Sequence, residues 1–175
     1  LLPILIEFIK LMNKKYKDFV YVFHSTLENI NFITEKLEKS NLDNCDIVVD
    51  KDIKSEVLLN SIFAVSKSGT VSLEICNAKV PSIIIYKMGT INFFIIKMLV
   101  KVKFANIVNI AAGEEVIPEL LQSKCNAKNI YNSVHKLMND KTALENQLNK
   151  TQSIISNFKT DKSSEIASSI LKDYI

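Results

Sequence analysis

Apolar positions along the chain alternate between two spacings, one typical of helices and one of buried strands. Residues 1–17 carry an apolar side chain every three to four positions, as one face of a helix requires. Residues 19–23 (FVYVF) form a short continuous apolar run, which is typical of a strand buried on both faces of a parallel sheet. Further strands are expected over 47–49, 61–65, 82–86 and 104–110, and helices between them over 29–39, 54–60, 71–77 and 91–100.

The last third of the chain has helical spacing. After Gly113 the pattern predicts a short helix through Leu121, and then helices over 126–138, 144–158 and 163–171. Strands that alternate with helices of this length form a parallel sheet with helices on both faces. We therefore predict an α/β fold with a doubly wound parallel sheet over residues 1–140. Residues 141–175 are expected to form a helical tail that packs on this domain or extends beyond it.

Composition supports one folded domain and argues against a membrane span. The 175 residues are 47% hydrophobic and 23% charged, which is typical of a globular chain. The longest nearly uncharged apolar runs are about ten residues, whereas a membrane-spanning helix needs ~20. Residues 1–12 include Glu7 and lack a basic leader, so no cleaved signal peptide is expected. Because the first residue is not Met, we expect the sequence to begin inside a longer reading frame.

The cysteines and histidines predict neither disulfides nor a metal site. Cys45, Cys76 and Cys125 are odd in number and widely spaced, which favours reduced thiols in the cytoplasm. His24 and His135 are isolated from each other and from the cysteines, so no metal-ligand spacing is present. His24 follows the first predicted strand, where it is either structural or at the edge of a cleft, and His135 is expected on the surface.

The basic residues limit how this protein can bind phosphate. All 22 are lysines, and the chain contains no arginine. Bidentate guanidinium–phosphate pairing is therefore excluded, and phosphates must be bound by backbone N–H groups, hydroxyls and lysine charges. The net charge of +3 is small, and no stripe of lysines alternates with aromatic residues. We therefore expect no nucleic-acid partner.

The segment after the third predicted strand is the first candidate site. It contains Ser68, Gly69 and Thr70 at the start of a predicted helix, and ligands of open parallel sheets bind beyond the carboxyl ends of the strands. The helix N-terminus there favours a diphosphate. Glu74 lies one turn further along the same face, where its carboxylate suits a ribose diol. The alternative is that Ser68 or Thr70 only caps the helix and that Glu74 is an ordinary first-turn acid.

The second candidate site follows the fifth predicted strand. Asn109 is expected at the end of that strand with its amide facing the same cleft, followed by small residues and by Glu114. The alternative is turn chemistry, because Asn and Gly favour such positions in any case.

The predicted helix over 91–100 is a candidate membrane-docking segment. Between Lys79 and Lys103 there are five lysines and no acidic residue, and the helix itself is apolar almost all round. Such a helix can place apolar side chains in a membrane surface while lysines reach anionic headgroups. The residues expected to do so are Phe93, Phe94, Lys97 and Lys101. The alternative is that this helix belongs to the core and covers the sheet.

Several short motifs resemble one enzyme family. They are Ser68-Gly69-Thr70 with Leu73-Glu74, Ala78-Lys79-Val80-Pro81, Tyr86-Lys87-Met88, Leu99-Val100-Lys101, Asn109 with Ala112-Gly113-Glu114, and Pro118-Glu119-Leu120-Leu121-Gln122. Together, at these spacings, they are similar to lipid-A-disaccharide synthase, a glycosyltransferase of the GT-B type. The resemblance is strong over about residues 61–136 and implies that this chain corresponds to the C-terminal, Rossmann-like, UDP-sugar-binding half of that fold.

The resemblance implies a reaction and a set of partners. The family transfers diacylglucosamine from UDP-2,3-diacylglucosamine to 2,3-diacylglucosamine 1-phosphate, without a metal or other cofactor. Gly69 and Thr70, with Ser68, would then hold the diphosphate, Glu74 the ribose, and Asn109 and Glu114 would lie near the donor. Acylated substrates favour the membrane-docking interpretation of 91–100, on the cytoplasmic leaflet of the inner membrane.

Three functional hypotheses follow. The family's Gly-Ser-Arg phosphate loop and its acceptor-side N-terminal half would precede Leu1, so no catalytic residue is assigned here. The first hypothesis is part of a lipid-A-disaccharide synthase that is active only with its other half. The second is another GT-B enzyme of UDP-N-acetylglucosamine, and the third is a non-catalytic fragment that only binds nucleotide.

Overall fold

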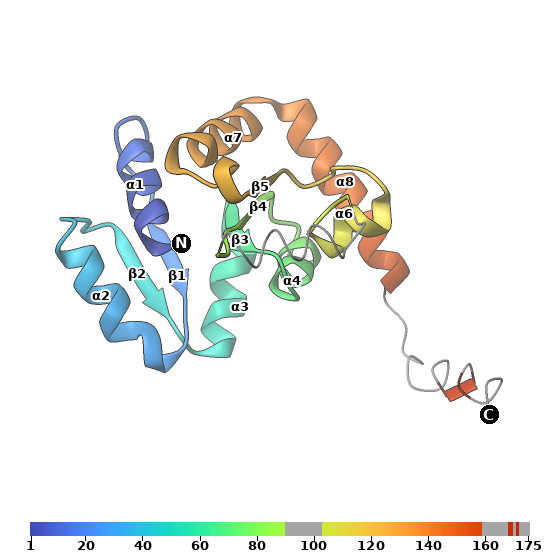
Figure 1. The fold of residues 1–175 in the computed structure, drawn as a ribbon, viewed down its shortest axis with the longest axis horizontal. Coiled ribbons are helices and arrows are strands. Elements are labelled where there is room, and N and C mark those ends of the chain that lie inside the picture. The colour runs from blue at the N-terminus through green and yellow to red at the C-terminus, as the bar shows by residue number, and fades with distance from the viewer. Residues whose placement is uncertain (90–102, 159–167, 170, 172–175) are drawn as a thin grey trace.

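The structure, a computed structural model, describes residues 1–89, 103–158, 168–169 and 171. Helices and parallel strands alternate along most of it, as Figure 1 shows. In chain order the elements are α1 (Leu2–Met12), β1 (Tyr21–His24), α2 (Ile30–Glu38), β2 (Cys45–Val48), α3 (Lys51–Leu59), β3 (Ala64–Lys67), α4 (Val71–Asn77), β4 (Ser82–Tyr86), α6 (Ile107–Ala112), β5 (Glu119–Leu121), α7 (Ala127–Asn139) and α8 (Lys141–Phe158). The predicted α/β class is confirmed.

The strands are parallel but are divided between two sheets. One sheet pairs β1 with β2, with Tyr21 opposite Cys45. The other has the order β3-β4-β5, with Ala64 opposite Ser82 and Ile84 opposite Glu119. The sequence predicts one sheet, whereas the described residues contain no ladder between β1 and β3.

Helices cover both faces of the β3-β4-β5 sheet, and strand β4 contributes to a hydrophobic core on each face. Ile83 and Ile85 pack with α1 and α7 on one face, in the larger hydrophobic cluster. Ile84 points to the opposite face, where it packs with α4, α6 and α8. All three isoleucines are at most 2% exposed, so β4 is the buried central strand that its apolar sequence predicts.

The prediction of a strand over 104–110 is wrong, because most of that segment forms helix α6. Asn106 begins the helix, and its Oδ1 accepts a hydrogen bond from the Val108 N–H at 2.9 Å. Gly113 ends it in the left-handed conformation, at φ 70°. The helix predicted through Leu121 is also wrong, since Glu119–Leu121 is strand β5. A short apolar run fits either periodicity, and here the caps favour the helix.

The C-terminal helical segment is confirmed, and its first helix packs on the sheet domain. From α8, the buried Gln147 accepts a hydrogen bond from the Ser82 N–H at 2.8 Å and donates one to the Ser82 carbonyl at 3.0 Å. The predicted helix over 91–100 lies outside the described residues, as does most of the one over 163–171. The domain boundary at residue 140 stays a prediction. Among the described residues, no helix is both long and apolar enough to cross a bilayer.

Candidate functional site

The turn from Ser68 to Thr70 joins the carboxyl end of β3 to helix α4. Gly69 has φ +151°, a conformation that side chains with a Cβ rarely adopt, so the path of the turn favours glycine. A Cβ at Gly69 would meet no atom within 4 Å, so the space beside the turn is open. The structure therefore places an exposed glycine turn where ligands of parallel sheets bind.

Side-chain hydrogen bonds hold this turn on two sides. The Ser68 hydroxyl donates to the carbonyl of Ala105 at 2.6 Å, which ties the turn to the start of α6. The buried Ser72 hydroxyl donates to the Gly69 carbonyl, also at 2.6 Å. Thr70 is the exposed N-cap residue of α4, yet its side chain makes no capping hydrogen bond. Thr70 therefore has the predicted N-cap position without a capping hydrogen bond from its side chain, and its hydroxyl stays at the surface.

Glu74 is exposed in the first turn of α4, and charges from two other elements lie near it. His24 is the last residue of β1, in the other sheet. Burial lowers the pKa of His24, the Lys54 cation lowers it further, and the Glu74 carboxylate opposes both. The Lys54 ammonium donates to the Ser25 carbonyl at 2.5 Å, directly after β1. The structure thus brings the carboxyl end of β1 close to the start of α4.

Lys54 is a candidate that the sequence analysis missed. It lies in the first turns of α3, which begins directly after the carboxyl end of β2 with Asp50 as its cap. Ligands of parallel sheets bind beyond the carboxyl ends of the strands, and this applies to the segment after β2 as much as to the turn at Ser68. In a chain without arginine, a lysine at that edge is the natural source of positive charge for a phosphate.

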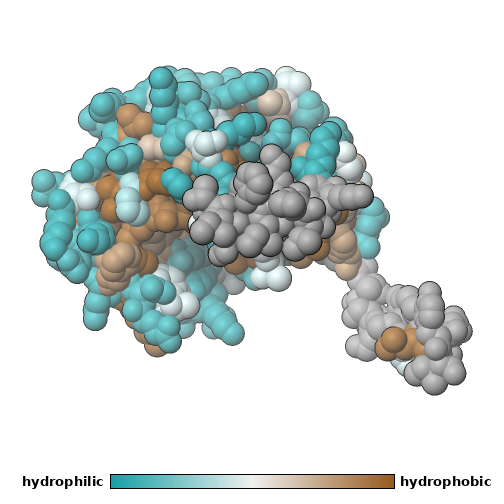
Figure 2. All heavy atoms as spheres, in the orientation of Figure 1, coloured by the Kyte–Doolittle hydropathy of each residue, from teal (hydrophilic) through white to brown (hydrophobic). Residues whose placement is uncertain are grey.

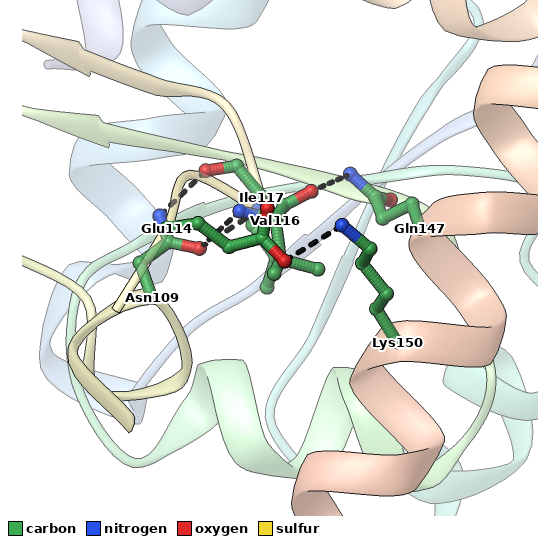
Figure 3. Close-up of polar contacts among 6 residues, drawn as sticks. All are labelled: Asn109, Glu114, Val116, Ile117, Gln147 and Lys150. Carbon is green, nitrogen blue, oxygen red and sulfur yellow. Dashed lines mark hydrogen bonds and ion pairs between the residues drawn. The ribbon is translucent and has the colours of Figure 1, made fainter. Parts of the chain in front are cut away.

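Asn109 does not lie at a strand end with a free amide, so that prediction is wrong. It lies in α6, its side chain is 0% exposed, and both ends of its amide are bonded (Figure 3). The Nδ2 group donates to the Ile117 carbonyl at 2.7 Å and to Glu119 Oε1 at 2.8 Å. Oδ1 accepts from the Val116 and Ile117 N–H groups, each at 2.9 Å. The amide therefore connects α6 to the segment that enters β5.

Glu114 lies at the other edge of the sheet from Ser68. It precedes β5, so it is at the amino ends of the parallel strands. Its carboxylate forms an ion pair with Lys150 of α8, at 2.6 Å, and both side chains are about half exposed (Figure 3). The structure therefore does not bring Glu114 together with the turn from Ser68 to Thr70.

Glu119 is a buried carboxylate that the sequence analysis left without a role. Its Oε2 accepts from the Ala105 N–H at 2.8 Å, and its Oε1 accepts from the Asn106 N–H at 2.9 Å as well as from Asn109. Since Ser68 donates to the carbonyl of Ala105, Glu119 positions the backbone that contacts the glycine turn. Because the sequence predicted a helix there, it did not show that Glu119 is the buried first residue of strand β5.

Two other predictions concern thiols and metals. The three cysteines are free, and burial raises the pKa of both Cys45 and Cys76 to about 11, so neither thiol is activated. Within the described ranges no group of three or more His, Cys, Asp or Glu side chains converges as a metal site would. The proposed membrane-docking residues Phe93, Phe94, Lys97 and Lys101 lie outside the described residues.

Comparisons with known proteins identify one family over nearly the whole chain. The family model described as lipid-A-disaccharide synthetase matches residues 1–172. The chain is 33% identical over 174 residues to a lipid-A-disaccharide synthase of Rickettsia typhi, covering 98% of this chain and 45% of the relative. A protein of the same name from Sulfurihydrogenibium sp. is 35% identical over 155 residues, covering 84% of this chain and 40% of the relative.

The chain therefore spans less than half the length of these relatives. A third, from Rickettsia felis, is 42% identical over a shorter stretch of 113 residues. Because the family match covers nearly the whole chain, the protein belongs to the lipid-A-disaccharide synthetase family.

Proposed function

We propose that this protein is the donor-nucleotide-binding portion of a glycosyltransferase of lipid A biosynthesis. The observation that carries the proposal is the family match over residues 1–172, in a chain whose exposed glycine turn lies at the carboxyl edge of a parallel sheet. The resemblance of the motifs around Ser68, Glu74 and Asn109 supports the same function. The enzyme would transfer diacylglucosamine from UDP-2,3-diacylglucosamine to 2,3-diacylglucosamine 1-phosphate.

In this proposal the UDP part of the donor lies across the start of α4. The diphosphate contacts the backbone of Ser68 and Gly69 and the hydroxyl of Thr70, while Lys54 supplies a nearby positive charge. The Ser68 hydroxyl, which donates to the Ala105 carbonyl, holds the turn in place. The exposed carboxylate of Glu74, one turn further along, accepts hydrogen bonds from the ribose diol. Such bonds to a charged acceptor are stronger than neutral ones, so Glu74 is the residue whose change tests the site best.

The remaining predicted residues have different roles in the proposal. Both ends of the Asn109 amide are already bonded inside the protein, so neither is free to bind the donor. In this proposal Asn109 holds α6 in place, and α6 in turn supports the glycine turn. Glu114, which the sequence predicts near the donor, lies at the opposite edge of the sheet beside Lys150, so the proposal gives it no contact with the nucleotide. Glycosyl transfer needs donor, acceptor and base in one cleft, so the acceptor and the base belong to the rest of the enzyme.

Calorimetry with UDP and with ADP tests the site. We expect UDP to bind and ADP to bind at least tenfold more weakly. Glu74→Gln should weaken UDP binding by about 1–3 kcal/mol, which is roughly 5- to 150-fold in Kd. Glu145→Gln is a matched control, because Glu145 is an exposed glutamate in α8, and it should leave the Kd unchanged. Equal binding of both nucleotides, or equal effects of the two variants, would contradict the site.

The same experiments separate the alternative functions. A different GT-B enzyme of UDP-N-acetylglucosamine would bind UDP but would not turn over acylated donor when combined with the rest of the protein. A non-catalytic fragment would bind nucleotide without supporting turnover of any donor. Turnover of UDP-2,3-diacylglucosamine by the full-length protein, reduced by Glu74→Gln and not by Glu145→Gln, supports the first hypothesis over both.

We also propose peripheral membrane binding at the cytoplasmic leaflet of the inner membrane. The support is in the sequence, where five lysines and no acidic residue lie between Lys79 and Lys103 around an apolar segment. Acylated substrates would reside in that leaflet. Phe93 and Phe94 would enter the membrane surface, while Lys97 and Lys101 contact anionic headgroups.

A further inference from the structure

Lys67 is the last residue of β3 and directly precedes the glycine turn. It is exposed, and in the β3–β4 ladder it lies opposite Ile85, next to Tyr86 at the end of β4. Its Nζ atom lies over the Tyr86 ring, 5.1 Å from the ring centroid. The ammonium group of Lys67 therefore lies at the carboxyl edge of the sheet, where ligands of parallel sheets bind.

Lys67 approaches the glycine turn from the face of the sheet opposite to α4 and α6. Val65 packs in the larger hydrophobic cluster with α1 and α7, and side chains alternate along a strand, so Lys67 lies on that same face. The Ser68 hydroxyl instead donates to the Ala105 carbonyl at the start of α6, which covers the other face. A ligand on the backbone of Ser68 and Gly69 is therefore within reach of side chains from both faces.

The charges assigned so far to the proposed donor site do not balance the charge of its ligand. Lys54 is positive and Glu74 is negative, so their formal charges cancel. The diphosphate of a UDP-sugar is a dianion, and the chain contains no arginine to pair with it. A further lysine at the turn supplies positive charge that the site otherwise lacks.

Within the described residues the partner of Lys67 is the Tyr86 ring and not a carboxylate. The two ion pairs found there join Lys39 to Glu35 and Lys150 to Glu114. Figure 2 shows hydrophobic surface gathered between the β1–β2 pair and the β3 sheet. A cation–π contact at an exposed site contributes only about two- to fivefold to an equilibrium constant, whereas a hydrogen bond to a charged group contributes about ten- to 150-fold. A phosphate at the turn should therefore replace the ring as the partner of Lys67.

We infer that Lys67 is a further donor-binding residue, whose ammonium group leaves the Tyr86 ring and contacts the diphosphate when the donor binds. The inference rests on the proposed function, because it requires the donor to lie on the glycine turn. Lys67 then holds the phosphates from the α7 side, while the backbone of Ser68 and Gly69 contacts them from the turn. Because the Tyr86 ring competes with the donor for the same ammonium group, the ring lowers the affinity for the donor.

Calorimetry with UDP on single and double variants tests this exchange. Lys67→Met should raise the Kd of UDP at least tenfold and make the Kd less dependent on salt, because a contact between charges has been removed. Lys67→Arg keeps the charge and should bind UDP within about threefold of the wild type. Tyr86→Leu should lower the Kd about two- to fivefold by freeing the ammonium group. This gain should be absent when Tyr86→Leu is combined with Lys67→Met.

Lys36 and Phe32 form a matched control pair in α2. The Lys36 Nζ atom lies 5.7 Å from the centroid of the Phe32 ring, so this pair has the same type of contact as Lys67 and Tyr86. Helix α2 connects β1 to β2, which belong to the other sheet. Lys36→Met and Phe32→Leu remove the same charge and a similar ring, and both should leave the Kd of UDP unchanged.

Equal effects of Lys67→Met and Lys36→Met would show that Lys67 does not contact the donor. The same conclusion follows if Lys67→Arg binds as weakly as Lys67→Met, or if the salt dependence of Lys67→Met equals that of the wild type. A gain from Tyr86→Leu that persists without Lys67 would rule out the exchange, and the Lys67 variants decide alone if Tyr86→Leu does not fold. Binding of UDP that depends on Glu74 but not on Lys67 would overturn only the role of Lys67. Wild-type protein that does not bind UDP would overturn this role and the proposed function together.

Discussion

The buried amide of Asn109 should contribute more to stability than any other single side chain of α6. Replacing it with alanine removes four hydrogen bonds, to Val116, Ile117 and Glu119. Val116 keeps a second acceptor for its N–H, the Glu114 carbonyl at 3.1 Å. Glu119 keeps its bonds from Ala105 and Asn106. The N–H and the carbonyl of Ile117 lose the partners that Asn109 supplies.

The expected loss follows from these two backbone groups. Leaving one buried donor or acceptor unsatisfied costs about 1–3 kcal/mol. Two such groups give about 2–6 kcal/mol, and partial relaxation of the loop that enters β5 will reduce the upper figure. Alanine is the better helix former, which returns less than about 1 kcal/mol. Asn109→Ala should therefore lower the free energy of unfolding by about 3 kcal/mol.

Urea denaturation followed by circular dichroism measures this change, with the slope m checked for constancy. Asn132→Ala is the matched control, because Asn132 is an exposed asparagine within α7. It carries the same gain in helix propensity without the buried bonds, so its stability should stay the same or rise slightly. If the free energies of unfolding of the two variants differ by less than about 1 kcal/mol, the buried amide does not stabilise the position of α6.

Four further predictions follow from the site, the sequence and the family. Lys54→Met should raise the pKa of His24, and Glu74→Gln should lower it, as measured by NMR titration of the imidazole. Shifts of the opposite sign would show that Lys54 and Glu74 do not lie near His24. Because the folded pKa of His24 is below its ordinary value, the unfolded state binds more protons, and stability should fall as pH drops below about 6.5. The 175-residue chain alone should not turn over UDP-2,3-diacylglucosamine, and clear turnover would refute the need for a second half. The 175-residue chain should co-sediment with anionic liposomes at low salt, and a folded Phe93→Ser plus Phe94→Ser variant should do so less. Wild-type protein that stays in the supernatant would contradict membrane docking.

Some elements were predictable because their signals are local. Helix α4 and strand β4 begin and end at the predicted residues, since a glycine turn and Pro81 separate two clear periodicities. The candidate turn at Ser68 was found in the same way, from a strand, a glycine and a helix in succession. The strand predicted over residues 61–65 has a weaker local signal at its start. In the structure it begins three residues later, at Ala64.

Other features depended on contacts between distant parts of the chain. The run around Asn109 has too few residues to distinguish a strand from a helix, and the choice was made by Asn106, Glu119 and the packing of α6. The same contacts buried the Asn109 amide that the sequence placed in a cleft.

The sequence by itself determined the α/β class, the helical C-terminal segment and the glycine turn, because periodicity and turn residues record local burial and backbone conformation. Only the tertiary structure decided which of the described strands pair and that His24 lies near Glu74 and Lys54. Strand order and side-chain neighbours arise from segments far apart in the chain, and no local pattern encodes them.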